Sequence, residues 1–222
     1  QGNATMVGAK YGLYAKTDIV HPDGHTGTVY SAGTLVEEKT FDKSGEIVFD
    51  NLYFGSYFVK EIENPEGYLM DSTEYPVRVS YKDQETPVVE VETTVYETVK
   101  KQPFQIVKIS SDGSSTETKL VEGAEFTVKL ESEVKEKGWD NAKVFDTLIT
   151  DAKGYALSVE LPYGVYHVKE TKTPADMNTT KDFYVNVSED SRTPQIWRVF
   201  NDAPFTAYIR LIKKDVDTGE IV

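Results

Sequence analysis

The sequence contains no cysteine among its 222 residues. This absence excludes disulfide bridges, thiolate metal sites and cysteine nucleophiles. Long hydrophobic runs are missing as well, since no apolar stretch approaches the roughly 20 residues that a membrane-spanning helix needs. The opening sequence QGNATMVGAK lacks the hydrophobic segment of a signal peptide. We therefore expect any export signal to lie outside this sequence.

Basic residues are scarce relative to acidic ones. The chain has 24 Lys and Arg residues against 37 Asp and Glu residues, which gives a net charge of −13. Such an acidic chain is poorly suited to bind nucleic acid or to insert directly into an anionic membrane, and we expect neither as a partner. Apolar residues (39%) and aromatic residues (12%) are frequent enough to build packed cores. The composition therefore predicts a globular protein and not a disordered acidic tail.

The chain has a β-strand pattern along nearly its whole length. Short runs rich in Val, Ile, Tyr, Phe and Thr alternate with turn sequences such as HPDGH, DKSG, NPEG and DAKG. Runs bounded by Gly, Pro, Asn and Asp are typical of strands joined by turns. Residues 131–142 alone have a local helical pattern, and Gly138 is expected to end that helix. The predicted fold class is all-β.

An internal repeat divides the chain. The sequence DKSGEIVFDNLYFGSYFVKEIENP at 42–65 matches DAKGYALSVELPYGVYHVKETKTP at 151–174 without a gap, and GAKYGLY at 8–14 matches GAEFTVK at 123–129. Each copy spans about a hundred residues, which is the usual size of one domain. We therefore predict two tandem β-domains, and the few strands with dense turns favour sandwiches.

The two copies do not begin at equivalent points. The second opens with a strand, PFQIVKISSDG, for which the first has no room ahead of its GAKY, and the tail repeats that strand with Lys213 in the place of Lys108. The predicted organisation is a domain at 1–100 that lacks its first strand, a complete domain at 101–204, and the first strand of a truncated third module at 205–222. The edge left by the missing strand is a place where the C-terminal strand of a neighbouring molecule can pair.

Three predicted strands of the second domain each end an apolar stripe with a polar residue. Residues two apart in a strand share a face, and the inward stripes end at Lys108, Glu170 and Asn201. A carboxylate on a face meant for the core is costly unless a partner satisfies it. If the three strands lie side by side, the three polar residues meet in one buried pocket.

These three residue types can react with one another. Burial lowers the pKa of a lysine, which leaves a neutral amine nucleophile, and it raises the pKa of a carboxyl group, which can then shuttle a proton. The amine of Lys108 can attack the carboxamide of Asn201 with the assistance of Glu170, releasing ammonia and leaving an isopeptide bond. The alternatives are a buried salt bridge with an amide neighbour, or simple rim positions where strands leave the core.

Several of these motifs together resemble a known family. GAEFTV, the Asp–x–x–Gly turn, LPYGVYHVKETKTP and the Lys108/Asn201 pair are similar to Cna B-type, SpaA-like modules, which occur in pilins and surface adhesins of Gram-positive bacteria. The resemblance covers essentially all of both domains. It implies an Ig-like β-sandwich of the inverse immunoglobulin, transthyretin-like type. It also implies an autocatalytic isopeptide bond between Lys108 and Asn201, with Glu170 as the proton shuttle.

The first domain departs from this pattern. Its Glu61 matches Glu170, but its lysine strand would lie before the start of the sequence. Aligning VYETVKKQPF on VFNDAPF puts Glu97 where Asn201 stands, and an unactivated carboxylate is a poor acyl acceptor for an amine. We therefore expect no standard cross-link there and interpret Glu61 as a hydrogen-bonded structural residue. Lys213 is the expected nucleophile of the third module.

The function predicted from the sequence is structural. Tandem β-sandwiches without cysteine are expected to form the stalk or backbone of a bacterial cell-surface adhesin or pilus-like protein, outside the cell and at its wall, with neighbouring modules of the same protein as partners. No Ser/His/Asp set and no phosphate-binding glycine loop is present, so we expect no enzyme activity beyond the single-turnover cross-link, and no cofactor. His21 and His25 lack a third ligand nearby, and we expect no metal.

Two other functions stay open. The segments at 20–36 and 131–145 differ most between the copies, and loops commonly carry binding. They would make the chain a ligand-binding adhesin module that recognises a host glycan or matrix protein. The remaining hypothesis is an accessory domain of a secreted enzyme.

Overall fold

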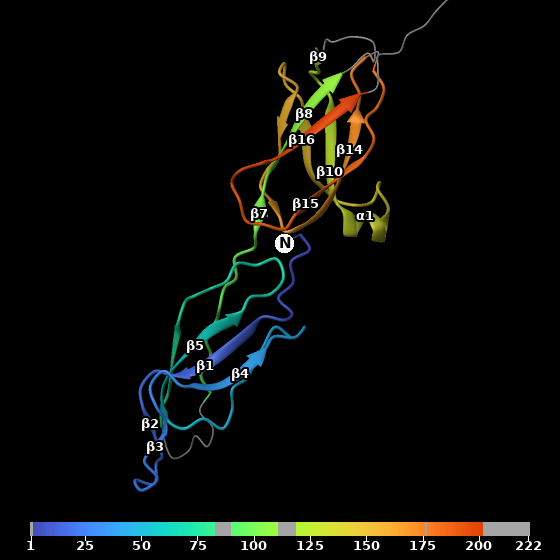
Figure 1. The fold of residues 1–222 in the computed structure, drawn as a ribbon. Coiled ribbons are helices and arrows are strands. Elements are labelled where there is room, and N and C mark those ends of the chain that lie inside the picture. The colour runs from blue at the N-terminus through green and yellow to red at the C-terminus, as the bar shows by residue number, and fades with distance from the viewer. Residues whose placement is uncertain (1, 83–89, 111–118, 176, 202–222) are drawn as a thin grey trace, which may run out of the picture.

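Two β-rich units lie end to end in the molecule (Figure 1). The computed structural model describes residues 2–82, 90–110, 119–175 and 177–201. We call residues 2–100 the N-terminal module and residues 101–201 the C-terminal module. The N-terminus itself lies at the junction between the two modules (Figure 1). The predicted third-module strand at 205–222 lies outside the described residues.

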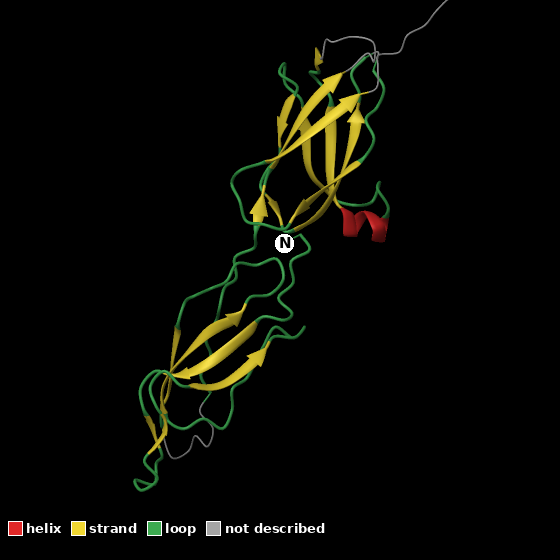
Figure 2. Ribbon diagram, viewed as in Figure 1, coloured by secondary structure: helices red, strands yellow, loops and turns green. Residues whose placement is uncertain are grey.

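The C-terminal module is a sandwich of two sheets (Figure 2). One sheet has the strand order β11 (Val144–Ile149), β10 (Glu125–Leu130), β14 (Gly164–Lys172) and β15 (Phe183–Val187). The facing sheet has the order β12 (Tyr155–Leu157), β8 (Phe104–Ser110) and β16 (Gln195–Asn201), with β9 (Lys119–Leu120) added to the end of β8. Strands β8 and β16 run parallel to each other. The all-β class and the sandwich architecture predicted from the sequence are confirmed.

Period-two alternation builds the core between these sheets. Along β8, every second residue from Phe104 to Ser110 is buried. The buried cluster takes side chains from both sheets, among them Phe104, Ile106, Val199, Phe126, Tyr166, Val168, Val185 and Val187. Each fully buried side chain of this size contributes on the order of 1.5 to 3 kcal/mol by leaving water. The hydrophobic alternation in the sequence therefore determines which face of each strand turns inward.

The N-terminal module repeats one of the two sheets. Its strands lie in the order β4 (Leu35–Thr40), β1 (Lys10–Ala15), β5 (Gly55–Glu63) and β6 (Tyr75–Val79). This is the order of β11, β10, β14 and β15, and the register is also repeated, because Tyr11 pairs with Glu61 as Phe126 pairs with Glu170. The described part of this module forms no second sheet like that of β12, β8 and β16.

Two segments that differ between the modules form their own small elements. A hairpin of β2 (Ile19–Val20) and β3 (Thr28–Tyr30) extends from the end of the N-terminal module that is far from the junction (Figure 1). In the C-terminal module, helix α1 (Glu131–Lys137) packs against β10 and β14. Gly138, with φ of 78°, caps the helix by donating its N–H to the carbonyl of Val134. The predicted helix and its end are therefore confirmed.

The junction between the modules is hydrogen-bonded around Tyr163. Its backbone N–H donates to the carbonyl of Lys100 at 2.8 Å, and its carbonyl accepts the N–H of Asn3 at 2.7 Å. Its hydroxyl donates to Oε1 of Glu66 at 2.5 Å. A Cβ atom on Gly67 would lie 2.6 Å from the Tyr163 ring, so a glycine is required for this close approach. Also at this end of the C-terminal module, β7 (Lys101–Gln102) pairs with β13 (Leu161–Pro162).

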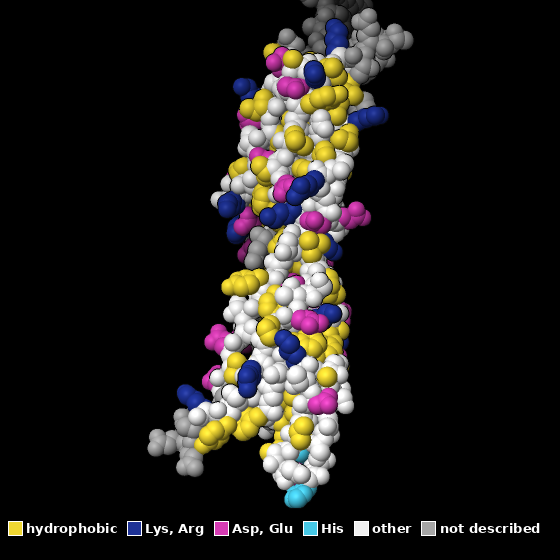
Figure 3. Space-filling model, turned by 90° about the vertical axis from the view of Figure 1, so that its left-hand side faces the viewer, with side chains coloured by type: hydrophobic (Ala, Val, Ile, Leu, Met, Phe, Trp, Pro, Cys, Tyr) yellow, Lys and Arg dark blue, Asp and Glu magenta, His cyan; other side chains and the backbone are white. Residues whose placement is uncertain are grey.

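The surface carries both signs of charge. Figure 3 shows an elongated molecule on whose visible face acidic and basic side chains are interspersed. In the described part of the chain, no helix has the length and apolar character needed to cross a membrane.

The two modules allow a matched test of packing at one turn. Gly154 and Gly45 occupy the same turn, with φ of +69° and +74°. A Cβ on Gly154 would lie 2.5 Å from the backbone oxygen of Lys108, whereas no described atom lies within 4 Å of a Cβ on Gly45. Alanine at either position costs about 1 to 2 kcal/mol for the left-handed backbone, and we expect Gly154→Ala to cost clearly more. Calorimetric unfolding of both variants measures this, and equal losses would contradict the packing.

Candidate functional site

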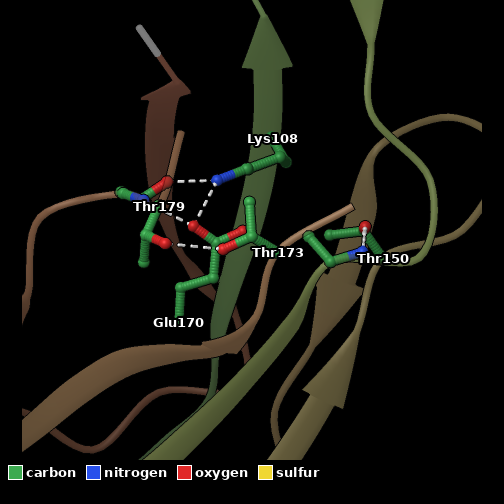
Figure 4. A network of polar contacts seen from close by, with 7 residues as sticks. Lys108, Thr150, Glu170, Thr173 and Thr179 are labelled. Carbon is green, nitrogen blue, oxygen red and sulfur yellow. Dashed lines mark hydrogen bonds and ion pairs between the residues drawn. The ribbon is translucent and has the colours of Figure 1, made fainter. Parts of the chain in front are cut away.

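A buried lysine forms the centre of the site. Lys108, on the inward face of β8, is 0% exposed. Its Nζ lies 3.0 Å from Oε2 of Glu170, whose side chain is equally buried (Figure 4). Removing each ion of such a pair from water costs several kcal/mol. The attraction between the two ions offsets this cost only when the geometry is good and further hydrogen bonds are made. A pair in this position is therefore specified by the fold, unlike a surface ion pair.

Glu170 reaches the lysine from the opposite sheet. The three site strands do not all lie side by side, which was the condition set for their meeting, because β8 and β16 are neighbours whereas β14 lies in the facing sheet. Strand parity predicts which residues turn into the core, and this condition is met equally by neighbouring strands and by strands that face each other across a sandwich. Period two therefore predicted that Lys108 and Glu170 both point into the core, and in the structure they meet across it.

Two further residues complete the surroundings of the pair, and neither was predicted from the sequence. The backbone N–H of Thr180 donates to Oε2 of Glu170 at 2.5 Å, and the Thr180 hydroxyl contacts Nζ of Lys108. The Phe126 ring centroid lies 5.2 Å from the same Nζ. Thr180 lies in the connection between β14 and β15, whose path is set by tertiary packing. The inward position of Phe126 could have been predicted from the alternating apolar residues of β10.

The buried setting works against the charged form of the lysine. Burial lowers the pKa of Lys108, and the hydrogen bond and charge of Glu170 oppose this shift without cancelling it. The other carboxyl oxygen of Glu170, Oε1, is buried and has no hydrogen-bond partner among the described side chains. The site thus combines an amine that loses its proton readily with a carboxyl oxygen that is available to a further group.

Asn201 is the last described residue of β16, and its side chain lies outside what the structure describes. The parallel ladder sets Val199 opposite Lys108 and Asn201 opposite Ser110. Position 201 is therefore the next position after Val199 on the same face of β16, diagonal to Lys108 on the adjacent strand.

The N-terminal module places Glu61 as the C-terminal module places Glu170. Glu61 is 4% exposed. Its Oε2 accepts the backbone N–H of Asp71 at 2.5 Å, ten residues along the chain, which is the same separation as between Glu170 and Thr180. The repeated motif therefore predicts the position and one hydrogen bond of this glutamate. These contacts agree with a structural role for Glu61.

The surroundings of Glu61 differ in charge from those of Glu170. No lysine lies against it among the described residues, and Glu97 lies beside it instead. Tyr11 donates its hydroxyl to Oε1 of Glu97 at 2.6 Å. Burial, chiefly, and the negative charge of Glu97 raise the pKa of Glu61 to about 7. The same position in the fold thus holds an amine–carboxyl pair in one module and a pair of carboxyl groups in the other.

The remaining candidate residues lie apart from this site. Lys213 lies outside the described residues. His21 and His25 lie in the loop between β2 and β3, where the N–H of His25 donates to Oδ1 of Asp23 at 2.8 Å. The described residues include no group of three or more His, Cys, Asp or Glu side chains placed to hold a metal ion.

The segments at 20–36 and 131–145, which differ most between the modules, differ in how closely they pack against their sheets. The β2–β3 hairpin projects from the molecule, whereas the segment of α1 is fastened to the sheet (Figure 1). His167 on β14 lies 3.2 Å from Oε2 of Glu131 and 2.8 Å from Oδ2 of Asp182. Lys129 Nζ donates to the carbonyl of Trp139 at 2.6 Å. The 131–145 segment is therefore packed structure more than a free loop.

Several solved structures are similar to this chain. The Bacillus anthracis TIE protein is similar over 90% of this chain and 32% of its own, with 24% identity and a TM-score of 0.57. The shaft pilin SpaA from Lactobacillus rhamnosus GG matches 55% of this chain and 58% of its own, at 20% identity and a TM-score of 0.40. The minor pilin GBS52 of Streptococcus agalactiae matches 94% and 88%, at 18% identity and a TM-score of 0.40. The chain thus spans about a third of the TIE protein and under two thirds of the shaft pilin.

The sandwich and its repeated sheet define the class of prealbumin-like β-modules. The model of one family in that class, described as the SpaA prealbumin-like fold domain, matches residues 1–95 and 102–198. The chain belongs to this family. The resemblance seen in the motifs is thereby confirmed. No curated protein matches the chain.

The raised pKa of Glu61 predicts a pH dependence for the N-terminal module. The folded module retains the Glu61 proton up to its pKa of about 7, whereas the unfolded chain releases it near the ordinary glutamate pKa of 4.5. Between these values the folded state binds more protons, so stability falls as pH rises from about 4.5 to about 7 and is level above. Each unit of pKa difference corresponds to about 1.4 kcal/mol.

Amide hydrogen exchange in β5 measures this dependence as a free energy of opening. The wild-type chain should lose stability between pH 5 and pH 8 relative to Glu61→Gln, because the amide keeps the shape of the protonated acid and does not ionise. Glu63→Gln, which changes an exposed residue of the same strand, is the matched control. An equal pH dependence in wild type and Glu61→Gln would contradict the assignment.

Proposed function

We propose that the chain is a structural portion of a Gram-positive cell-surface stalk or pilus-like protein, and that an isopeptide bond between Lys108 and Asn201 locks its C-terminal module. The observation that carries the proposal is the fully buried contact of Lys108 with Glu170, beside the strand that ends in Asn201. Membership of the SpaA family supports the structural role. The proposed location is extracellular, and the proposed partners are other subunits or modules of the same assembly.

The reaction begins with the neutral amine of Lys108. Its Nζ attacks the side-chain carbonyl carbon of Asn201, which forms the new amide bond. Glu170 takes a proton from the attacking nitrogen and delivers one to the departing NH2 group, so that ammonia leaves and the carboxyl group regains its initial state. The buried setting supplies the proximity of an intramolecular reaction, an effective concentration on the order of 10⁵ M or more.

The bond would join two strands that lie near opposite ends of the module's sequence. It connects β8 to β16, so almost the whole module lies within the closed loop. In the loop-entropy model, such a closure destabilises the unfolded chain by about 4 to 5 kcal/mol. Unlike a disulfide, it cannot be reduced, which suits a chain that has no cysteine.

The junction at Tyr163 also supports a load-bearing role. Backbone and side-chain hydrogen bonds join Tyr163 of the C-terminal module to Asn3, Glu66 and Lys100 on the N-terminal side. Interfaces within a chain usually permit domain motion unless they are well packed. These contacts favour a stalk in which force passes directly from one module to the next.

Intact-mass spectrometry tests the cross-link. The wild-type chain should be lighter than its sequence mass by one ammonia because Lys108 displaces the amide nitrogen of Asn201. Lys108→Ala, Asn201→Ala and Glu170→Ala should each restore this mass. Asn186→Ala, an asparagine exposed on β15, is the matched control and should keep the loss.

The comparison with Lys108→Ala separates the cross-link from other losses of ammonia. An N-terminal glutamine and an asparagine that forms a succinimide also release ammonia, but neither reaction needs Lys108. A wild-type chain of full mass, or a loss that persists in Lys108→Ala, would contradict the proposal.

A further inference from the structure

We propose that Thr180 is a positioning residue of the cross-linking reaction, and that it orients the amine of Lys108 for its attack on Asn201. Thr180 itself takes no part in making or breaking a bond. This inference rests on the proposed function and adds a residue to the same site. It is carried by the contacts among Lys108, Glu170 and Thr180.

Thr180 contacts both members of the buried pair. Its backbone N–H donates to Oε2 of Glu170 at 2.5 Å, and its side-chain oxygen accepts a hydrogen bond from Nζ of Lys108. The same Nζ donates to Oε2 of Glu170 at 3.0 Å (Figure 4). The three residues therefore form a closed ring of hydrogen bonds. Because Lys108 is 0% exposed, protein groups and not bulk water orient its amine.

The two acceptors determine where the lone pair of the neutral amine points. An amine nitrogen has four tetrahedral directions, which in Lys108 hold Cε, two hydrogens and the lone pair. Oε2 of Glu170 and Oγ1 of Thr180 accept the two hydrogens, so only one direction is left for the lone pair. With Glu170 alone, the staggered positions about the Cε–Nζ bond would leave the lone pair two choices.

The remaining direction leads away from one sheet of the sandwich. Glu170 lies on β14 and Thr180 lies in the connection from β14 to β15, so both acceptors belong to the same side of the core. The lone pair points away from both. Position 201 lies in the other sheet, on β16, which is the neighbour of the strand that carries Lys108. Correct orientation of a nucleophile is a large part of the advantage of an intramolecular reaction.

The backbone amide of Thr180 also holds the carboxyl group of Glu170. Oε2 accepts hydrogen bonds from both the amide and Nζ of Lys108, whereas Oε1 has no partner among the described side chains. The terminal torsion of a carboxyl group is broad and roughly two-fold, and two donors on one oxygen select one orientation. Oε1 is thereby the oxygen that Glu170 presents to a further group.

The N-terminal module separates the backbone contact of this position from the side-chain contact. Asp71 is the equivalent of Thr180, and its N–H donates to Glu61 at 2.5 Å. Its carboxylate serves its own turn, where it accepts the N–H of Thr73 at 2.9 Å and the hydroxyl of Tyr75 at 2.5 Å. The backbone hydrogen bond is therefore common to both modules. The side-chain contact with an amine belongs to the site that contains the lysine.

The hydroxyl of Thr180 also has an effect of opposite sign. An oxygen that accepts a hydrogen bond from an ammonium group stabilises the charged form, which leaves less of the neutral nucleophile. Burial lowers the pKa of Lys108, and Glu170 opposes this shift in the same way as such an oxygen does. Removal of the hydroxyl therefore speeds the reaction if its main effect is on charge. It slows the reaction if its main effect is on orientation.

The rate of ammonia loss in the 222-residue chain tests the inference. The chain is purified in denaturant, before it has folded, and is refolded by dilution at a series of pH values. Its mass is recorded at intervals, and the fluorescence of Trp139 and Trp197 follows folding in the same samples. The rate is taken after the fluorescence change is complete, so that slow folding is not counted as slow chemistry. The pH series gives the maximal rate, at which the charge on the amine no longer limits the reaction.

Thr180→Val should lower this maximal rate about tenfold, which corresponds to about 1.4 kcal/mol of activation free energy. Valine has nearly the shape of threonine and keeps the backbone N–H, so only the hydroxyl is lost. Thr180→Ser restores the oxygen and should recover most of the rate. Thr179→Val is the matched control, because it makes the same change at the neighbouring exposed residue and removes a hydrogen bond of 2.9 Å to Thr173. It should react as the wild-type chain does.

Three results would overturn the role of Thr180. They are a maximal rate in Thr180→Val equal to or above that of the wild type, an equal slowing in Thr179→Val, and no recovery in Thr180→Ser. A wild-type chain that keeps its full mass would contradict the cross-link and this inference together. Failure of the inference alone is therefore distinguishable, because the wild-type chain then still loses ammonia.

Discussion

The burial of Lys108 against Glu170 is the constraint on which the C-terminal module depends. Both side chains are shielded completely from water, and an ion pair in such a place is not a stabilising device in itself, because desolvation offsets its attraction. The fold nevertheless surrounds it with the Thr180 amide and the Phe126 ring. An arrangement that costs free energy to form is consistent with a role in chemistry more than in packing.

The two modules share one sheet architecture but place different groups beside the buried glutamate. Their four-stranded sheets share strand order and register, and their glutamates accept the same backbone hydrogen bond. They differ in the groups that the flanking strands contribute. Where Lys108 comes from β8, the glutamate has a cation; where that strand is not among the described residues, Glu61 meets Glu97 and its pKa rises to about 7. The repeated motif therefore specifies the sheet, and the partner strands specify what the glutamate does.

The sequence predicted most of the architecture because the signals are local. Strand alternation, the repeat and the end of the helix at Gly138 depend on neighbouring residues, and the inward faces of Lys108 and Glu170 follow from period two. The position of β14 in the facing sheet could not be predicted in this way, because the alternation of side chains does not distinguish a neighbouring strand from a strand across the core. Thr180 was missed because its position depends on the path of a connection that no periodicity describes. The domain bounds and the reaction remain predictions.

The central claim is that the buried amine of Lys108 ends as an amide of Asn201. Tandem mass spectrometry of a proteolytic digest tests it directly, because it identifies which peptides are joined and at which residues. The account predicts a branched species in which the peptide containing Lys108 is linked through Nζ to the side chain of Asn201. Separate linear peptides with an unmodified Lys108 and an intact Asn201 would contradict it.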